Sequence, residues 1–112
     1  MKLPNKVRVA CFDIEIEEWD HRNATADGNF GTFSCIELKI RIDTTCHPIM
    51  IAEVLQHEIL HAIYWAYVIK DKDEEERIVS VMATALVQVY RDNPEIMKYI
   101  SYLLCNKESG DD

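Results

Sequence analysis

The residues of this chain that are best suited to chemistry are His57, Glu58 and His61, which form the pattern His-Glu-x-x-His. Residues four apart lie on one face of a helix, so both imidazoles can bind one metal ion. Zinc takes neutral histidine nitrogens at about 2.0–2.1 Å, and a catalytic site adds a third protein ligand and a water. The carboxylate after the first histidine can accept a proton from that water. The pattern therefore predicts zinc bound by His57 and His61, with Glu58 as general base.

The surrounding sequence predicts that this motif lies in a buried helix. Pro48 suits the first turn of a helix, and residues 49–67 contain no Gly or Pro and are apolar almost all round. Ionisable side chains are seldom placed in such a helix unless they are paired or bind a metal. The alternative is a pair of core histidines beside an exposed glutamate. A lone histidine would favour that alternative, whereas two histidines four apart with an intervening glutamate do not.

A third zinc ligand has to come from another element, and the candidates are Glu74, Glu75 and Glu76. Glu75 shares the apolar face of the next predicted helix on a wheel of about 100° per residue. That face consists of Val79, Met82, Leu86 and Val89. Asp73 and Glu76 have capping-box spacing, which gives Glu76 another role. We predict Glu75 as the third ligand, with Glu76 as the alternative. The remaining possibility is that all three are solvated acids at a helix N-terminus.

The position of Glu75 sets a condition on the first helix. Thirteen residues separate His61 from Glu75, and each helical residue rises about 1.5 Å. The first helix must therefore end near residues 64–67 so that the connection can return toward the metal.

Strand patterns precede the motif. Residues 6–18 alternate, with a parity shift that suggests a bulge or a strand buried on both faces. Residues 19–33 contain two of the three glycines and predict a long turn or hairpin loop. Residues 36–42 alternate strictly between apolar and charged side chains. This pattern predicts a strand with one face on the core, in an antiparallel or edge position.

Two further helices are predicted after the motif. Asp73 opens one helix that runs to Asp92, and Asn93-Pro94 ends it and starts another that runs to about Cys105. The tail, residues 106–112, is polar, and we expect it to be disordered. The expected architecture is therefore one α+β domain over residues 1–112.

Composition narrows the classes of function. The chain has 112 residues, with 20 acidic and 12 basic side chains and a net charge of −8, and it has no basic run. Nucleic-acid binding is therefore not expected. No segment approaches the roughly 18 apolar residues of a membrane span, and the N-terminus has no apolar signal core. The four cysteines include no Cys-x-x-Cys pair, which predicts buried free thiols. These features favour a cytoplasmic protein that does not bind membranes.

Three segments carry a resemblance to a known family: residues 57–63, 74–79 and 86–94. The chain resembles the zincin metallopeptidases, in particular their gluzincin branch and the small zincin-like proteins encoded by tailed phages and prophages. The resemblance implies a hairpin or edge strand, then a buried HExxH helix and two further helices. It also implies Zn²⁺ bound by His57, His61 and Glu75, with Glu58 as general base, and a location in the host cytoplasm if the protein is phage-encoded.

The same resemblance assigns a substrate site to the strand at 36–42. That strand resembles the zincin edge strand that lines the substrate cleft, which would make Ile36, Leu38 and Ile40 the substrate-binding residues. An extended peptide would pair with it by adding a further strand.

These observations lead to two main hypotheses. The first is a minimal zinc metallopeptidase, in which a metal-activated water attacks a peptide bond of a peptide or protein substrate. The alternative is a catalytically weak or inactive zinc-stabilised module of phage origin that binds or regulates a partner, because metal binding contributes strongly to the folding of small domains. A third hypothesis is a small helical adaptor in which the HExxH pattern is incidental and binds no metal. The sequence leaves the oligomeric state open.

Overall fold

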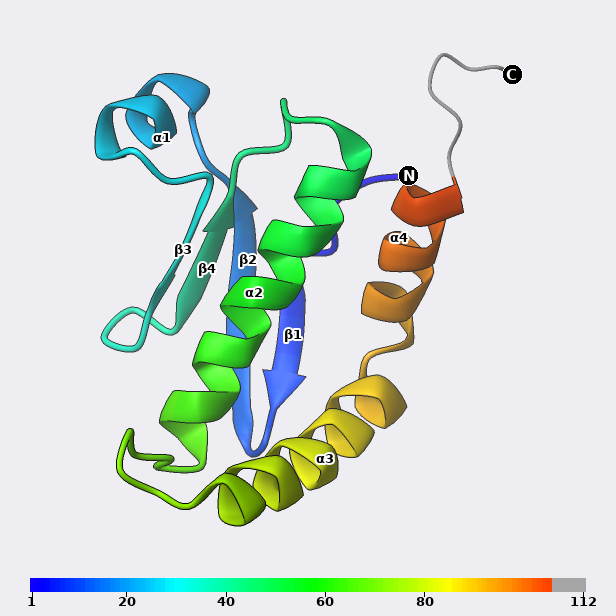
Figure 1. The fold of residues 1–112 in the computed structure, drawn as a ribbon. Helices are drawn as coiled ribbons and strands as arrows, with labels where there is room; N and C mark the ends of the chain where they lie inside the picture. Colours follow the sequence, from blue (N-terminus) through cyan, green and yellow to red (C-terminus); the bar gives the residue numbers. More distant parts are fainter. Residues whose placement is uncertain (106–112) are drawn as a thin grey trace.

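The structure, a computed structural model that describes residues 1–105, packs three long helices against one mixed sheet (Figure 1). In chain order the elements are β1 (Lys6–Val9), β2 (Phe12–Glu18), α1 (His21–Asp27), β3 (Gly31–Ser34), β4 (Lys39–Ile42), α2 (Pro48–Ala66), α3 (Glu75–Asp92) and α4 (Pro94–Cys105). The predicted α+β class is confirmed, and so are a helix that contains the HExxH motif and two helices after it.

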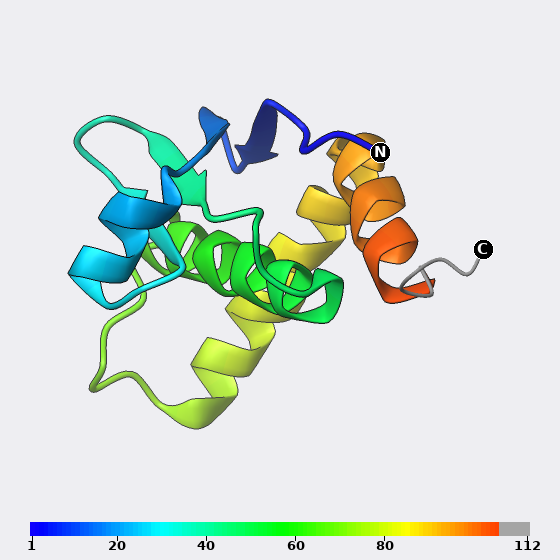
Figure 2. The same cartoon turned by 90° about the horizontal axis from the view of Figure 1, so that it is seen from above.

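The sheet has the strand order β1-β2-β4-β3. The β1–β2 and β3–β4 pairs are antiparallel, whereas β2 and β4 are parallel. Seen from above, the strands lie on one side of the molecule and α2, α3 and α4 on the other (Figure 2). The fold is therefore two layers, with helices on one face of the sheet.

Residues 6–18 form a hairpin, so the prediction of a single strand with a bulge is wrong. Val9 pairs with Phe12 across a two-residue turn, and Ala10 has a φ of 56°. This left-handed conformation is the one that two-residue hairpin turns require at their first central residue. The turn reverses the chain, which explains the parity shift. The Gly or Asn residue that usually marks such a turn is absent from Ala10-Cys11.

Residues 19–33 contain α1 and β3, where a long loop was expected. The Asp20 carboxylate accepts a hydrogen bond from the Arg22 N–H at 3.1 Å and caps the N-terminus of α1. Gly28 ends the helix with a φ of 80° and donates to the carbonyls of Ala24 and Thr25. The Asp-Gly pair that suggested a tight turn is thus a helix C-terminus, a position that also favours glycine.

The strand predicted at 36–42 is shorter than expected and is not an edge strand. Residues 35–38 form a turn, in which Leu38 has a φ of 53° and Ile36 is 93% exposed. Lys39–Ile42 form β4, which pairs with β2 on one side and β3 on the other. The alternation correctly indicated a strand buried on one face, since Ile40 and Ile42 are fully buried. It carries no information on how many neighbours the strand has.

The helix α2 lies at the centre of the core, as its apolar sequence predicted. Its bounds, Pro48–Ala66, satisfy the condition that it ends near residues 64–67. The side chains that it buries are Ile51, Ala52, Leu55, Glu58, Ile59, Ala62 and Ile63. They pack between the sheet and α4, which buries Ile96, Tyr99 and Leu103 against them.

The predicted capping box at the start of α3 does not form. The helix begins at Glu75, and its N-cap residue Glu74 makes no side-chain capping bond. The Asp73 carboxylate instead accepts from the Lys70 N–H at 2.7 Å and from the Arg77 guanidinium at 2.8 Å. Asp73 therefore fixes the turn that precedes α3 rather than the helix end itself.

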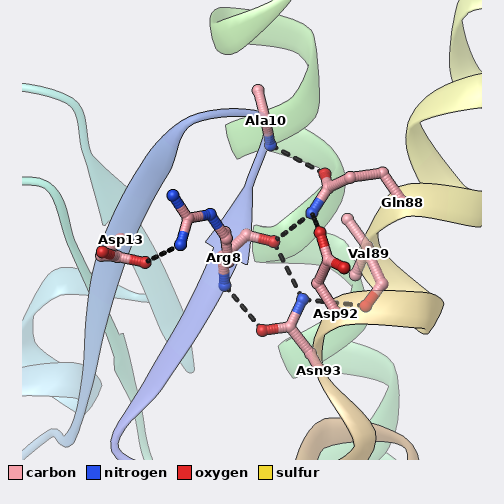
Figure 3. Close-up of polar contacts among 7 residues, drawn as sticks. All are labelled: Arg8, Ala10, Asp13, Gln88, Val89, Asp92 and Asn93. Atoms are coloured by element: carbon pink, nitrogen blue, oxygen red, sulfur yellow. Dashed lines mark hydrogen bonds and ion pairs between the residues drawn. The ribbon is translucent and has the colours of Figure 1, made fainter.

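Two carboxamide side chains hold β1 against the junction of α3 and α4 (Figure 3). The Asn93 amide group donates to the Arg8 and Val89 carbonyls at 2.9 and 2.8 Å, and its oxygen accepts from the Arg8 N–H at 2.7 Å. Gln88 accepts from the Ala10 N–H at 2.7 Å and donates to the Arg8 carbonyl at 3.0 Å. These side chains occupy backbone groups on the outer edge of β1 that another strand would otherwise use.

Three remaining expectations concern the whole chain. Cys11, Cys35, Cys46 and Cys105 all carry free thiols as predicted, but only Cys46 is shielded from solvent, and then in part. Within residues 1–105, every helix is too short or too polar to cross a membrane. The expected disorder of 106–112 lies outside the described residues.

The bonds of Asn93 predict a large loss of stability when its side chain is removed. In Asn93→Ala the Arg8 N–H loses its partner and the Arg8 and Val89 carbonyls each lose one donor, which costs about 2–3 kcal/mol in the free energy of unfolding. Urea denaturation measures the loss. The matched control, Asn5→Ala, changes an exposed asparagine and stays within about 0.5 kcal/mol. Equal effects of the two variants would contradict the role of Asn93.

A second polar cluster attaches α1 to the end of β4. The Asp43 side chain is fully buried, and its oxygens lie 2.6 Å from the His21 Nδ1 and 2.6 Å from the Thr45 hydroxyl. Burial by itself raises the pKa of Asp43, but the hydrogen bonds from Thr45 and His21 outweigh it and lower the pKa below its usual value. The charged carboxylate is therefore more stable in the folded chain than in the unfolded one.

Asp43→Asn is expected to lower stability at neutral pH by about 1–3 kcal/mol. Because the folded pKa is depressed, the contribution of Asp43 is present above the unfolded pKa and is lost as pH falls through the folded value. The difference between wild type and variant should thus shrink on acidification from pH 7 to pH 3. Urea titrations at several pH values measure it, with the exposed Asp13→Asn as control. A difference that stays constant with pH would rule out this account.

Candidate metal centre

The HExxH motif lies in the second half of α2, which buries one face in the core both before and after the motif. His57 and His61 are exposed and Glu58 is 6% exposed. The two Nε2 atoms are 3.1 Å apart, with ring centroids 4.8 Å apart. The predicted pairing of the imidazoles on one helix face is therefore observed, and the glutamate between them points inward.

The distance between the two nitrogens fits a shared zinc ion. Two ligands at about 2.05 Å and a tetrahedral angle lie about 3.3 Å apart. A single N–H···N hydrogen bond between neutral imidazoles would give a similar distance. The donor chemistry suits Zn²⁺, because His57 and His61 present imidazole nitrogens to one point at the surface.

In the part of the chain that the structure describes, no third ligand accompanies the two histidines. Within residues 1–105, no group of three His, Cys, Asp or Glu side chains is placed to hold a metal. Glu75 and Glu76 are exposed at the start of α3, beyond the C-terminal end of α2 (Figure 1). Glu75 therefore stays a prediction as third ligand, and it could bind only if the 67–74 connection rearranged.

The position of Glu75 along α3 explains why it lies elsewhere. Glu75 is the first residue of the helix, whereas the residues that α3 buries are Ala85 and Val89. Ala85 is ten residues farther along, a rise of about 15 Å. Glu75 therefore lies beyond the contact between α3 and the core, although Met82 and Leu86 of the predicted face do pack against the core.

The Glu58 carboxyl has the character of a proton acceptor. Burial raises its pKa above the usual value, although the nearby charges of His57 and His61 act in the opposite direction. A raised pKa makes a carboxylate a stronger base, closer to the value that suits proton transfer at neutral pH.

The edge strand β3 lies directly against the part of α2 that contains Val54 and Glu58. A Cβ atom built on Gly31 would lie 2.4 Å from Val54 Cγ1 and 3.3 Å from the Glu58 Oε2. Only glycine allows the strand to approach the helix this closely. Gly31 therefore sets the distance between the sheet edge and the Glu58 carboxylate.

A surface hollow of about 660 Å³ lies between β3 and α2. His57, Glu58 and His61 line it, and so do Phe33 of β3, Trp65 of α2 and Val68, which follows α2. Phe33 and Trp65 have ring centroids 5.8 Å apart. This hollow therefore combines the candidate metal ligands with an apolar part.

The substrate residues predicted from the strand at 36–42 are not in this hollow. Ile36 is 93% exposed in the turn before β4, Leu38 packs against the core from the same turn, and Ile40 is fully buried within the core. A fully buried side chain has no surface to offer a substrate, so the choice of Ile40 is wrong. The strand that borders the hollow is β3, which the sequence interpretation had assigned to a loop.

The alternation of Thr32 and Phe33 beside Gly31 was too short to indicate a strand. A four-residue strand gives a weak periodic signal, and glycine is typical of turns. Sequence reasoning therefore missed Gly31, Phe33 and Trp65 as residues that shape the site.

Comparison of the chain with protein-family models, curated proteins and solved structures finds no significant match.

The contact at Gly31 predicts a coupled effect of two substitutions. Gly31→Ala places a methyl group against the stiff Val54 side chain, which should lower the free energy of unfolding by about 1–3 kcal/mol. Val54→Ala alone removes apolar contacts and is also destabilising. The double variant should be more stable than the sum of the single effects predicts, because the smaller side chain makes room. Urea denaturation of all four proteins measures this coupling, and strictly additive values would refute the contact.

Proposed function

We propose that this chain is a zinc-dependent metallopeptidase of minimal size, with His57 and His61 as metal ligands and Glu58 as general base. The observation that carries the proposal is the arrangement of these side chains: two Nε2 atoms 3.1 Å apart beside a buried carboxylate. Core histidines that serve packing alone would not be exposed as a converging pair next to a hollow.

The chemistry assigned to each residue follows from its position. When bound, Zn²⁺ would supply Lewis acidity, which lowers the pKa of water to about 7 and polarises a carbonyl. Glu58 takes the proton from the attacking water and then delivers it to the leaving amine. Glu58 is 6% exposed, and a Cβ atom at Gly31 would lie 3.3 Å from its Oε2, so burial beside β3 limits the positions that the carboxylate can adopt. This restriction is what a base needs if it is to act on a substrate held in the hollow.

The substrate proposed here is an extended peptide that pairs with β3. The Asp43 N–H donates to the Phe30 carbonyl at 2.9 Å, and hydrogen-bonded pairs alternate along an antiparallel ladder. The backbone groups of Gly31 and Phe33 must therefore point away from β4, toward the open edge. At the opposite edge of the sheet, Gln88 and Asn93 occupy the backbone of β1. Of the two edges, β3 is the one left for strand addition.

A second candidate function is a zinc-stabilised binding module without useful catalysis. It is favoured by one observation: among residues 1–105 no third carboxylate, histidine or cysteine joins the imidazole pair. A site with two protein ligands would hold zinc weakly and would depend on the partner to complete it.

Glu58→Gln distinguishes the two functions. Under the peptidase proposal the variant retains zinc affinity within about twofold but loses at least about a hundredfold in hydrolysis, because only the base is removed. Zinc binding is measured by titration calorimetry of protein purified without a metal-affinity tag, and hydrolysis by cleavage of a degenerate peptide library. Glu53→Gln, one turn earlier on the same helix, is the matched control and should change neither quantity.

Other variants test the ligands in the same titration. His61→Ala should abolish zinc binding, and a loss of affinity in Glu75→Ala but not in Glu76→Ala would establish the third ligand. Wild-type protein that binds less than half an equivalent of zinc would defeat both candidate functions. Zinc binding without any cleavage by the wild type would leave only the binding module.

A further inference from the structure

Val68 has a backbone conformation that its residue type disfavours. Its φ is 55°, in the left-handed region. A β-branched residue there is a true outlier, since the Cβ atom crowds the backbone. Ala10 and Leu38 are the other non-glycine residues between 1 and 105 with positive φ, and neither is β-branched.

The outlier arises from the way in which α2 ends. The Ile69 N–H donates to the Tyr64 carbonyl at 3.0 Å, and the Val68 N–H donates to the Trp65 carbonyl at 3.2 Å. This is the Schellman arrangement, which places the residue after the C-cap in the left-handed region and is usually completed by glycine. Val68 stands where glycine would satisfy the same hydrogen bonds without strain.

Packing does not explain the presence of valine. Its side chain is 63% exposed and is not among those that contact the hydrophobic core. The neighbouring Ile69 is 5% exposed and supplies the apolar contact that usually accompanies this helix ending. The Val68 side chain therefore makes no contact with the hydrophobic core that would offset the backbone strain.

The side chain does line the hollow that contains the imidazole pair. The helix ends five residues after His61, a rise of about 7.5 Å, and Val68 is two residues farther on. An extended peptide covers a distance of about 10 Å in about three residues. Phe33 and Trp65 line the same hollow as Val68, so the side chain of a peptide residue bound there would meet an apolar surface.

We propose that Val68 is a specificity-determining residue, whose side chain contacts an apolar side chain of the peptide two or three residues from the scissile bond. Backbone strain that persists without a packing benefit is typical of functional positions. The inference rests on the proposed function, because it concerns the same hollow and the same extended substrate. It adds the chemical class of the preferred residue and the group that selects it.

The test compares three variants with zinc-loaded wild type, using a degenerate octapeptide library whose cleavage sites are identified by mass spectrometry. Val68→Gly removes the side chain and the strain, and Val68→Asn keeps the volume in a polar residue that tolerates positive φ. Ala10→Gly is the matched control, because it relieves a similar strain in the β1–β2 turn, away from the hollow.

The wild type and Ala10→Gly should cleave with an apolar residue enriched at that position. Val68→Gly should lose about tenfold of the enrichment, the effect of one lost apolar contact in a pocket, and Val68→Asn should shift it toward polar residues. Both glycine variants should keep or raise the urea midpoint of unfolding. An enrichment that is unchanged in Val68→Gly, or a lowered midpoint in that variant, would overturn the proposal.

An affinity selection separates this inference from the proposed function. The same library is applied to immobilised Glu58→Gln protein, with and without Val68→Gly, and the retained peptides are sequenced. If the wild type cleaves nothing but retention of apolar peptides depends on Val68, the peptidase proposal fails and the contact of Val68 with an apolar side chain of a bound peptide stands. If retention does not depend on Val68 either, the specificity role fails as well.

Discussion

The close approach of β3 to α2 is the contact on which the rest of the candidate site depends. A Cβ atom on Gly31 would overlap Val54 and press on Glu58, so the strand can lie this close only because the side chain is absent. The approach brings an open strand edge, a buried carboxylate and two exposed imidazoles to one hollow. If residue 31 carried a methyl group, β3 would lie farther from α2 and its edge would lie farther from the Glu58 carboxylate.

At two positions that line the hollow, the residue type lowers the stability of its own strand or helix end. Gly31 weakens a strand by its backbone freedom, and Val68 strains the end of a helix. If only the local element mattered, the strand would favour a β-branched residue at position 31 and the helix end would favour glycine at position 68. The scaffold that supports them is well satisfied, because Asn93 and Gln88 hold β1 to the helices and Asp43 holds α1 to the sheet. Gly31 and Val68 both line the hollow.

The coordination of a metal is the part of the site that remains incomplete in the described residues. Two imidazoles converge, yet the acidic start of α3 faces solvent. The turn fixed by Asp73 separates α2 from α3 and holds Glu75 away from the histidines. A small domain with an open, two-histidine site is suited to a ligand set that is completed by a movement of this turn or by the substrate.

The sequence by itself determined the features that depend on local periodicity. Residue spacing along one helix predicts the span of α2 and the shared face of His57 and His61, and the proline predicts the break at Asn93-Pro94. All three features are observed. Tertiary structure decided which strand borders the hollow and where Glu75 lies, because both depend on pairing between segments far apart in the chain. The parallel pairing of β2 with β4 places β3 at the edge. No periodic pattern within β4 records that neighbour.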